Sequence, residues 1–503
     1  MKEESIAIIG AGIAGLSAGC YGQMNGYRTH IFELHDKPGG LCTSWTRRGY
    51  TFDGCIHWLV GSGEGSPFNQ IWRELGAVQG RTIVDHDVFT RVEGEGGKAF
   101  IVYTDLDRLE EHMKALSPED ADTIDEFISA AHKFTRLSDA MGDPGGPSSW
   151  WDKIKAGFRM LPLLGTLRKF SKMSVQEFGA RLRDPFLHDA FVSLFDFPDF
   201  PMTGVLATLA WMHNEDAGYP VGGSLAFARA IEQRYLDLGG EIHYRARVER
   251  ILVKDDRAVG VRLTDGTEHP ADVVISAADG HSTIFEMLEG EYTDEKIRGY
   301  YDEWPIFPPL VQVSLGVARD LSDEPHMVSY PLDDPIEVDG RPRARLGVKH
   351  YGYDPTLAPE GKSVLIVMFD SDYEYWRALV EEGEERYDAE KKQIALDVID
   401  RLDGRFPGLE EAVEVVDVAT PLTTERYTGN WKGSMEGWLI TTDNIGMTFG
   451  RGMRQMLPGL DNFYMAGQWV EPGGGVPTAA LSARKAIKTI CKRDGRRFTT
   501  ETP

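Results

Sequence analysis

The sequence lacks the features that mark several large classes of protein. Its 503 residues hold only four cysteines and no CxxC pair, so neither a disulfide framework nor a thiolate metal site is expected. No run of about 18 apolar residues occurs, so no transmembrane helix is expected. The acidic N-terminal residues have neither a basic stretch nor a small-residue cleavage site, so no secretory signal is expected. Together these absences favour a reducing, cytoplasmic setting.

Basic residues are also scarce. The chain has 54 lysines and arginines against 79 aspartates and glutamates, a formal charge of −25, which argues against a nucleic-acid partner. The thirteen histidines are scattered and no HExxH motif occurs, so no metal site is expected. A GxSxG match at 15–19 falls inside a predicted helix and not at the strand-to-helix turn that a nucleophilic serine requires. The length predicts two or three globular domains and leaves the oligomeric state open.

The N-terminal region has the pattern of a βαβ unit. An apolar, β-branched run at 6–9 predicts a buried strand, GxGxxG follows at 10–15, and a helix of small residues is predicted over 16–23. A second strand is predicted at 27–32 and leads into Glu33. This is the order of elements in which the glycine motif binds an adenine dinucleotide.

Each position of the motif has a physical role. Gly10 permits the tight turn, Gly12 lets the backbone approach a pyrophosphate, and Gly15 lets the helix pack against the strands. The helix N-terminus offers free N–H groups and a positive dipole end to the phosphates. Glu33, 18 residues after Gly15, is placed to accept hydrogen bonds from the adenosine ribose.

A second glycine cluster lies near the C-terminus. A predicted strand at 462–465 runs into Gly467, and the glycine-rich turn 471–477 then leads into a small-residue helix at 478–483. This arrangement again presents backbone amides at a helix N-terminus, where they can meet an anion or the edge of a flavin ring.

Four blocks of sequence carry a family resemblance. They are GxGxxG with Glu33, KPGG with GYTFD at 37–53, GGS through Val248 to VVISAAD at 222–279, and AG with PGGG at 466–475. With these blocks the chain resembles the FAD-dependent phytoene desaturase, carotenoid isomerase and retinol saturase group of the amine oxidase superfamily.

The resemblance implies FAD as cofactor and an α/β fold. In this fold a Rossmann-type FAD-binding domain, built on the GxGxxG βαβ unit, is interleaved with an α+β substrate domain. We expect the FAD-binding domain to comprise 1–75, 222–290 and 455–503, and the substrate domain to comprise 76–221 and 291–454.

The resemblance also implies a set of cofactor-binding residues, among them Val248, whose backbone would contact adenine unless it is simply a core valine. The set is Gly10, Gly12, Ile13, Ala14, Gly15, Glu33, Gly39, Gly40, Leu41, Val248, Gly467, Gly475 and Val476. The group commonly has arginine at the position of Leu41, so Thr43, Ser44, Arg47 or Arg48 would have to replace its contact with the phosphates.

Two residues are candidates for proton transfer beside the flavin. Glu471 stands where the group often has histidine, and a carboxylate in an apolar flavin pocket has its pKa raised by desolvation. His57 follows the second block. The alternative for each is structural: Glu471 would hydrogen-bond the glycine turn, and His57 would be an ordinary core histidine.

Three further segments allow two interpretations each. The basic, tryptophan-containing piece 150–172 has one apolar helical face, so it suits either a membrane interface or lipid-access surface, or packing on the protein's own core. Aromatic residues between 186 and 211 suit a tunnel wall or a core. The glycine- and tryptophan-rich segment 427–438 suits a loop lining the cavity or a structural loop.

Three functions remain open from sequence. The first is an FAD-dependent oxidoreductase that desaturates, saturates or isomerises carbon–carbon bonds of a hydrophobic polyene or related lipid. The second is a flavin amine oxidase, for which Tyr427, Trp431, Trp438 and Trp469 would form an aromatic cage. The third is an FAD-containing binding protein that performs no redox chemistry.

Overall fold

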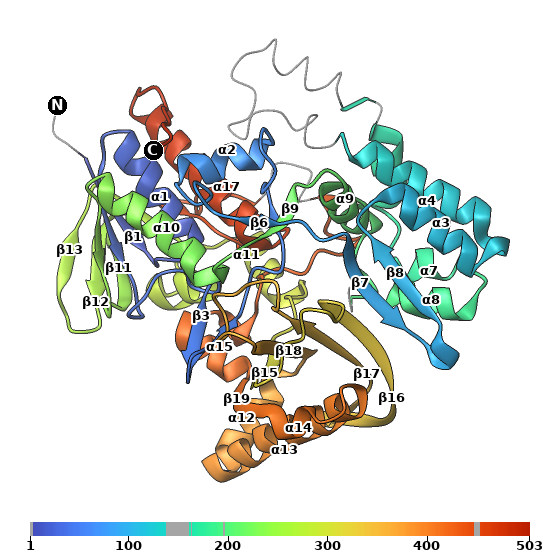
Figure 1. Cartoon of the computed structure of the whole chain (residues 1–503). Helices are drawn as coiled ribbons and strands as arrows, with labels where there is room; N and C mark the ends of the chain where they lie inside the picture. Colours follow the sequence, from blue (N-terminus) through green and yellow to red (C-terminus); the bar gives the residue numbers. More distant parts are fainter. Residues whose placement is uncertain (1–3, 137–159, 162, 195–196, 447–452) are drawn as a thin grey trace.

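The computed structural model describes residues 4–136, 160–161, 163–194, 197–446 and 453–503. Figure 1 shows two large sheets in different halves of the molecule, with a separate group of helices beside the second sheet. The two halves exchange the chain several times, as the interleaved arrangement predicts.

The first sheet is parallel and has the strand order β10-β2-β1-β14-β20. Its strands come from three distant parts of the chain: β1 Ser5–Ile9, β2 Arg28–Phe32, β10 Glu241–His243, β14 Val273–Ser276 and β20 Phe463–Met465. Ile8 pairs with Ile31 on one side and Ile275 on the other, and all three are fully buried. An apolar run of this kind needs cover on both faces.

Helices cover one face of this sheet and a small β-meander covers the other (Figure 1). The helices are α1 Ile13–Met24, α10 Gly223–Asp237 and α17 Gly475–Arg493. The meander consists of β11 Val248–Lys254, β12 Arg257–Leu263 and β13 Glu268–Pro270. The predicted strands and helices of the dinucleotide domain are therefore confirmed, with ends that differ by a few residues.

The second sheet has seven strands and is mainly antiparallel, with one parallel pair between β16 and β7. In spatial order the strands are β19 Val413–Ala419, β15 Leu310–Val317, β18 Ser363–Asp370, β17 Arg341–His350, β16 Met327–Val338, β7 Val88–Glu93 and β8 Ala99–Tyr103. Helices α12 Tyr373–Glu382 and α13 Glu384–Arg405 pack their apolar side against it. This sheet and its helices form the core of the second half of the molecule.

A group of helices packs beside β7 and β8 around its own apolar core (Figure 1). It includes α3 Leu106–Leu116, α4 Ala121–Phe134, α7 Val175–Gly179, α8 Pro185–Val192 and α9 Met202–His213. Phe191 is buried there between Phe127 and Phe178, so the core interpretation holds for this aromatic residue. Phe197 instead reaches the large cavity described below.

Shorter elements connect the two halves. They are β3 Ser44–Arg47, β4 Tyr50–Asp53, β5 Leu59–Val60, β6 Ile83–Val84, β9 Ala217–Pro220, α2 Pro67–Glu74, α11 Glu295–Glu303, α14 Leu409–Ala412 and α15 Pro421–Thr428. Asp53 at the end of β4 accepts hydrogen bonds from the Ser224 amide and hydroxyl, both at 2.6 Å, and so joins this hairpin to the start of α10.

Much of the basic segment 150–172 lies outside the described residues. In the part that is described, Leu161 and Leu164 are about half exposed, whereas Leu163 and Phe170 are buried in the helical core. Among the described helices, none combines the length and the apolar character needed to cross a bilayer.

Candidate active site

A cavity of about 700 Å³ runs between the two halves of the molecule. It opens at the carboxyl ends of the parallel strands, which is where open α/β sheets bind their ligands. The volume lies within the range of about 300–1,000 Å³ usual for small-molecule sites. The cavity has a glycine-rich part against the first sheet and an apolar part against the second.

The first glycine loop forms one wall. The Gly10 amide donates to the Phe32 carbonyl at 2.8 Å, which folds the loop back over β2. Gly12 pairs with Gly39 of the second block, and the Gly39 amide donates to the Ala11 carbonyl at 2.9 Å. The two glycine loops therefore stand side by side, and their small residues leave room for a pyrophosphate against the N-terminus of α1.

Glu33 marks the ribose end of the cavity. One carboxylate oxygen accepts from the Ala11 amide at 2.6 Å and the other from the His35 amide at 2.8 Å. Burial raises the pKa of this carboxyl, although both amide bonds favour its charged form. Val248 lies beside it, 4% exposed, and is at once a core residue and a lining residue.

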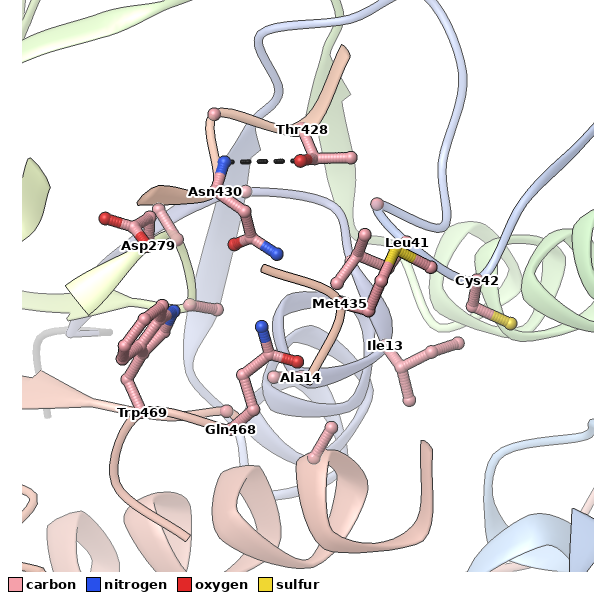
Figure 2. A pocket seen from close by; sticks show the side chains of 18 of the residues that line it. Ile13, Ala14, Leu41, Cys42, Asp279, Thr428, Asn430, Met435, Gln468 and Trp469 are labelled. Carbon is pink, nitrogen blue, oxygen red and sulfur yellow. Dashed lines mark hydrogen bonds between the residues drawn. The ribbon is translucent and has the colours of Figure 1, made fainter. Parts of the chain in front are cut away.

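Polar side chains gather at the opposite end. In Figure 2, Asn430 and Gln468 direct their amides toward the space between them, with Trp469 beside them and Leu41 and Met435 across from them. Asn430 is held by its own backbone N–H, which donates to the Thr428 hydroxyl at 3.2 Å, and by its side-chain amide, which donates to the Ser434 carbonyl at 3.0 Å. The described residues provide no hydrogen-bond partner for the Gln468 amide, which leaves it available to a ligand.

The cavity gathers almost the whole predicted cofactor set. The lining residues from that set are Gly10, Gly12, Ile13, Ala14, Glu33, Gly39, Gly40, Leu41, Val248, Gly467, Gly475 and Val476. Gly15 is the exception and does not line the cavity. A Cβ on Gly15 would lie 1.8 Å from the Gly10 carbonyl oxygen, so its place in the motif is explained by packing of α1 on the loop and not by contact with a ligand.

The proposed substitutes for the missing arginine are not brought to the cavity. Thr43, Ser44, Arg47 and Arg48 are absent from its wall, and Arg47 pairs instead with Asp417 at 3.0 Å. Arg247, immediately before β11, does line the cavity. The sequence analysis named Val248 but missed its neighbour Arg247. The Arg247 guanidinium is a cavity-lining group of the same chemical type as the missing arginine.

The structure corrects the assignment of Glu471. Its carboxylate does not line the cavity and accepts from Lys485 Nζ at 2.7 Å on the outer side of α17. The glycine turn bends the chain so that the next residues, not Glu471, face inward. The buried carboxylate that the sequence analysis assigned to Glu471 is therefore supplied by a different residue, Glu436, which is described below.

We expect Glu471→Gln to leave the flavin site intact. The ion pair that it removes is partly exposed and contributes at most about 1 kcal/mol. FAD content and turnover should match those of the unaltered protein within twofold, as measured by visible absorption and steady-state rates. A loss of more than tenfold in turnover would restore Glu471 as a catalytic candidate.

Glu436 occupies the position expected for Glu471. It belongs to the glycine-rich segment 427–438, lines the cavity, and lies against Gly474, where an added Cβ would be 2.0 Å from its Oε2. Burial raises the pKa of this carboxyl to about 7, and the described residues offer it neither a hydrogen bond nor a counter-ion. The segment is thus a cavity-lining loop, and only its spacing of glycines hinted at this from sequence.

His57 does line the cavity, as predicted, but it has a partner that the sequence does not reveal. Lys349 at the end of β17 places its Nζ 2.8 Å from His57 Nδ1. Burial lowers the pKa of Lys349 to about 7 and holds the pKa of His57 well below its usual range. The pair therefore carries at most one extra proton at neutral pH.

The aromatic cage of an amine oxidase is not assembled. Of the four residues proposed for it, Trp469 lines the cavity, whereas Trp438 is fully buried beneath it. Trp431 stacks on His281 with ring centroids 4.7 Å apart, and Tyr427 lines an adjoining hollow. The three tryptophans pack against one another, with Trp469 5.0 Å from Trp438 and 6.2 Å from Trp431 between ring centroids, but only Trp469 of the four residues lines the cavity.

A glycine-lined groove across the ends of a Rossmann-type sheet, joined to an apolar chamber in a second domain, defines a dinucleotide-dependent flavoprotein oxidoreductase. Residues 13–490 match the family described as flavin containing amine oxidoreductase, and the chain belongs to this family. FAD is its cofactor. The residues fit it, since the paired glycine loops, Glu33 and the unpartnered Gln468 amide provide sites for pyrophosphate, ribose and the polar edge of a flavin.

Similar proteins agree with this assignment. The chain is 25% identical to the chloroplastic prolycopene isomerase of Daucus carota, over 96% of this chain and 79% of the relative. It is 27% identical to the neurosporene-forming phytoene desaturase of Rhodobacter capsulatus, over 96% and 93%. An oxidoreductase from Methanosarcina mazei shares the fold, with a TM-score of 0.62 at 19% identity, covering 96% of this chain and all of that one.

Proposed function

We propose that this FAD-dependent oxidoreductase acts on carbon–carbon bonds of a hydrophobic polyene, by desaturation, saturation or isomerisation. One observation carries the proposal: the part of the cavity wall that faces the second sheet is apolar. Phe197, Phe307, Leu310, Met368 and Met435 form it. The relatives named above act on molecules of this class, which supports the same chemistry here.

A long substrate also needs a way in. A hollow of about 490 Å³ adjoins the main cavity and shares Leu310, Thr428 and Met435 with it. Charged side chains, among them Asp36, Lys37 and Arg47, line this hollow, so it suits water or a polar group and not the hydrocarbon itself. We propose that the substrate comes from a lipid surface, with the exposed leucines at 161 and 164 near the contact, and that the protein acts in the cytoplasm.

Bound FAD supplies hydride transfer at its ring, so the chain's own groups must position the substrate and handle the accompanying proton. The apolar wall aligns the hydrocarbon and excludes water, which matters because such a substrate offers few polar handles. Several titratable groups line the cavity, among them the Glu436 carboxyl, the His57 imidazole and the Asp279 carboxyl.

The proposal predicts a response to polyenes and not to amines. Purified protein loaded with FAD is titrated anaerobically with lycopene, its cis isomers, retinol and a set of primary amines. For at least one polyene we expect one of three results. Loss of the oxidised flavin absorption would indicate desaturation, and its recovery after prior reduction of the flavin would indicate saturation. A shifted double bond in the product without a change in the flavin would indicate isomerisation. Bleaching by an amine alone would favour an amine oxidase, and inertness toward every compound would favour the non-catalytic binding protein.

A further inference from the structure

A second, much smaller cavity lies on the far side of His57. It has a volume of about 30 Å³, enough for about two water molecules. His57 lines both cavities, and Lys349 lines the small one. His57 therefore lies between the reaction cavity and a water-sized space.

The small cavity has a mixed lining, in which several polar groups lie beside apolar side chains such as Trp58 and Phe89. His86 and His326 stack with ring centroids 3.8 Å apart, and His86 Nε2 is buried without a hydrogen-bond partner among the described residues. Tyr219 donates to Asp354 at 3.1 Å and lines the same space. An unpartnered nitrogen facing a water-sized cavity is the usual setting of an ordered water molecule.

One wall of the small cavity reaches the surface. Asp85 lines it and is exposed, whereas Lys349 is only 7% exposed. From the reaction cavity outward, the order is therefore His57, then Lys349, then the water-sized space, and finally Asp85 at the surface. The three side chains, and water in the space, can each accept or release a proton.

We propose that His57 and Lys349 form a proton relay that joins the reaction cavity, through the small cavity, to solvent at Asp85. The inference rests on the proposed function, because a hydride transfer at carbon leaves one proton to be delivered or removed while the bound hydrocarbon keeps water from the reacting atoms. Water in the small cavity then exchanges protons with Lys349 and, at the surface, with Asp85.

The transfer balances without any oxidant or reductant. For delivery, His57 gives its Nε2 proton to the acceptor in the reaction cavity while Nδ1 takes a proton from the Lys349 ammonium. One N–H bond breaks and one forms on the ring, and the Lys349 amine is reprotonated by water. For removal, the same bonds change in reverse. Each transfer interchanges the two tautomers of His57. After the product leaves, Nδ1 returns its proton through Lys349 to water in the small cavity, and Nε2 takes a proton from water that enters the reaction cavity.

The charges around the pair suit a single mobile proton. The groups that face it are Asp53, His86, Tyr219, His326, His350 and Tyr351. Burial lowers the pKa of His86 to about 4 and that of His326 to about 2, so both imidazoles are neutral at pH 7. The negative charge of Asp53 favours the protonated form of Lys349 and so partly offsets the effect of burial on its pKa.

The test replaces Lys349 with methionine, which keeps the length and removes the amine. Turnover of the best polyene should fall at least tenfold, lose its inflection near pH 7 and show a larger solvent deuterium isotope effect, with unchanged FAD content and substrate affinity. Lys296→Met on the exposed face of α11 is the matched control and should change none of these. Unaltered rate, pH profile and isotope effect in Lys349→Met would overturn the relay.

A second measurement does not depend on turnover. The pKa of Lys349 in the folded protein lies below its unfolded value, so the unfolded chain binds more protons between about pH 7 and 10 and stability rises with pH in this window. Lys349→Met should lack that rise, and histidine NMR of Lys349→Met should show loss of the hydrogen bond at His57 Nδ1. If no polyene reacts with the unaltered protein, the proposed function fails while these two readouts still decide whether the pair exists. His57→Gln serves if Lys349→Met does not fold.

Discussion

Gly15→Ala is expected to abolish FAD binding and to destabilise the protein severely. The added Cβ would lie 1.8 Å from the carbonyl oxygen of Gly10 and 3.0 Å from its carbonyl carbon, and both are backbone atoms. Relief requires α1 to move away from the first glycine loop, which separates the paired loops that hold the pyrophosphate. We expect less than about a tenth of the normal FAD content and a loss of about 3 kcal/mol or more in unfolding free energy, since overpacking against backbone cannot relax.

Gly299→Ala is the matched control for this substitution. Gly299 lies within α11, and a Cβ there would meet nothing within 4 Å. Alanine in a helix is favoured over glycine by about 1 kcal/mol, so the variant should keep its FAD and gain slightly in stability. Flavin absorbance relative to protein absorbance, with thermal and urea unfolding, measures both variants. Normal FAD content in Gly15→Ala would show that the contact between α1 and the loop is not required for the cofactor.

Glu436 is expected to make substrate affinity strongly dependent on pH. Its carboxyl lies in the cavity without a counter-ion, with its pKa raised to about 7 by burial. An apolar substrate that expels water around it binds the neutral form, because a charge without partners in a dry cavity is costly. The sign follows directly: affinity is highest below pH 7, and above it the dissociation constant should rise about tenfold per pH unit.

Glu436→Gln isolates this effect, because the amide has the same shape and stays neutral. Its affinity for a polyene, measured by quenching of protein fluorescence between pH 6 and 9, should be nearly constant, so that at pH 9 it binds about 100-fold more tightly than the unaltered protein. Glu471→Gln is the control, since that carboxylate lies outside the cavity and should keep the normal profile. A Glu436→Gln profile that still falls above pH 7 would assign the dependence to another group.

The pH dependence of affinity and that of proton transfer are separable. Glu436 has no bonded partner among the described residues and acts on binding, whereas His57 has Lys349 at 2.8 Å and acts on the rate. Glu436→Gln should change the substrate dissociation constant and leave the solvent isotope effect alone. Lys349→Met should do the opposite.

Much of the FAD half could be predicted because its determinants are local. The turn at Gly10, the close approach at Gly12 and the acid at Glu33 lie within one βαβ unit, whose geometry follows from the strand, the helix and their spacing. The predicted cofactor residues of the second and fourth blocks also line the cavity, since each glycine loop sits at the end of a strand of the same sheet.

The proton-carrying groups could not be predicted, because they depend on chain segments that are far apart. Lys349 and His57 are 292 positions apart, and they meet only because β17 of the second sheet ends beside the loop after β4. Glu436, and not Glu471, faces the cavity because of the glycine turn. The turn directs the Glu471 carboxylate outward to Lys485, and Gly474, which has no side chain, leaves space for the Glu436 carboxylate.

The sequence by itself therefore determined the dinucleotide fold, the cofactor and the family of this protein, since strand period, glycine spacing and helix start are short-range properties of the chain. The tertiary structure alone decided which side chains face the apolar part of the cavity. Burial and long-range packing set the charge of those groups, and neither can be obtained from spacing along the chain.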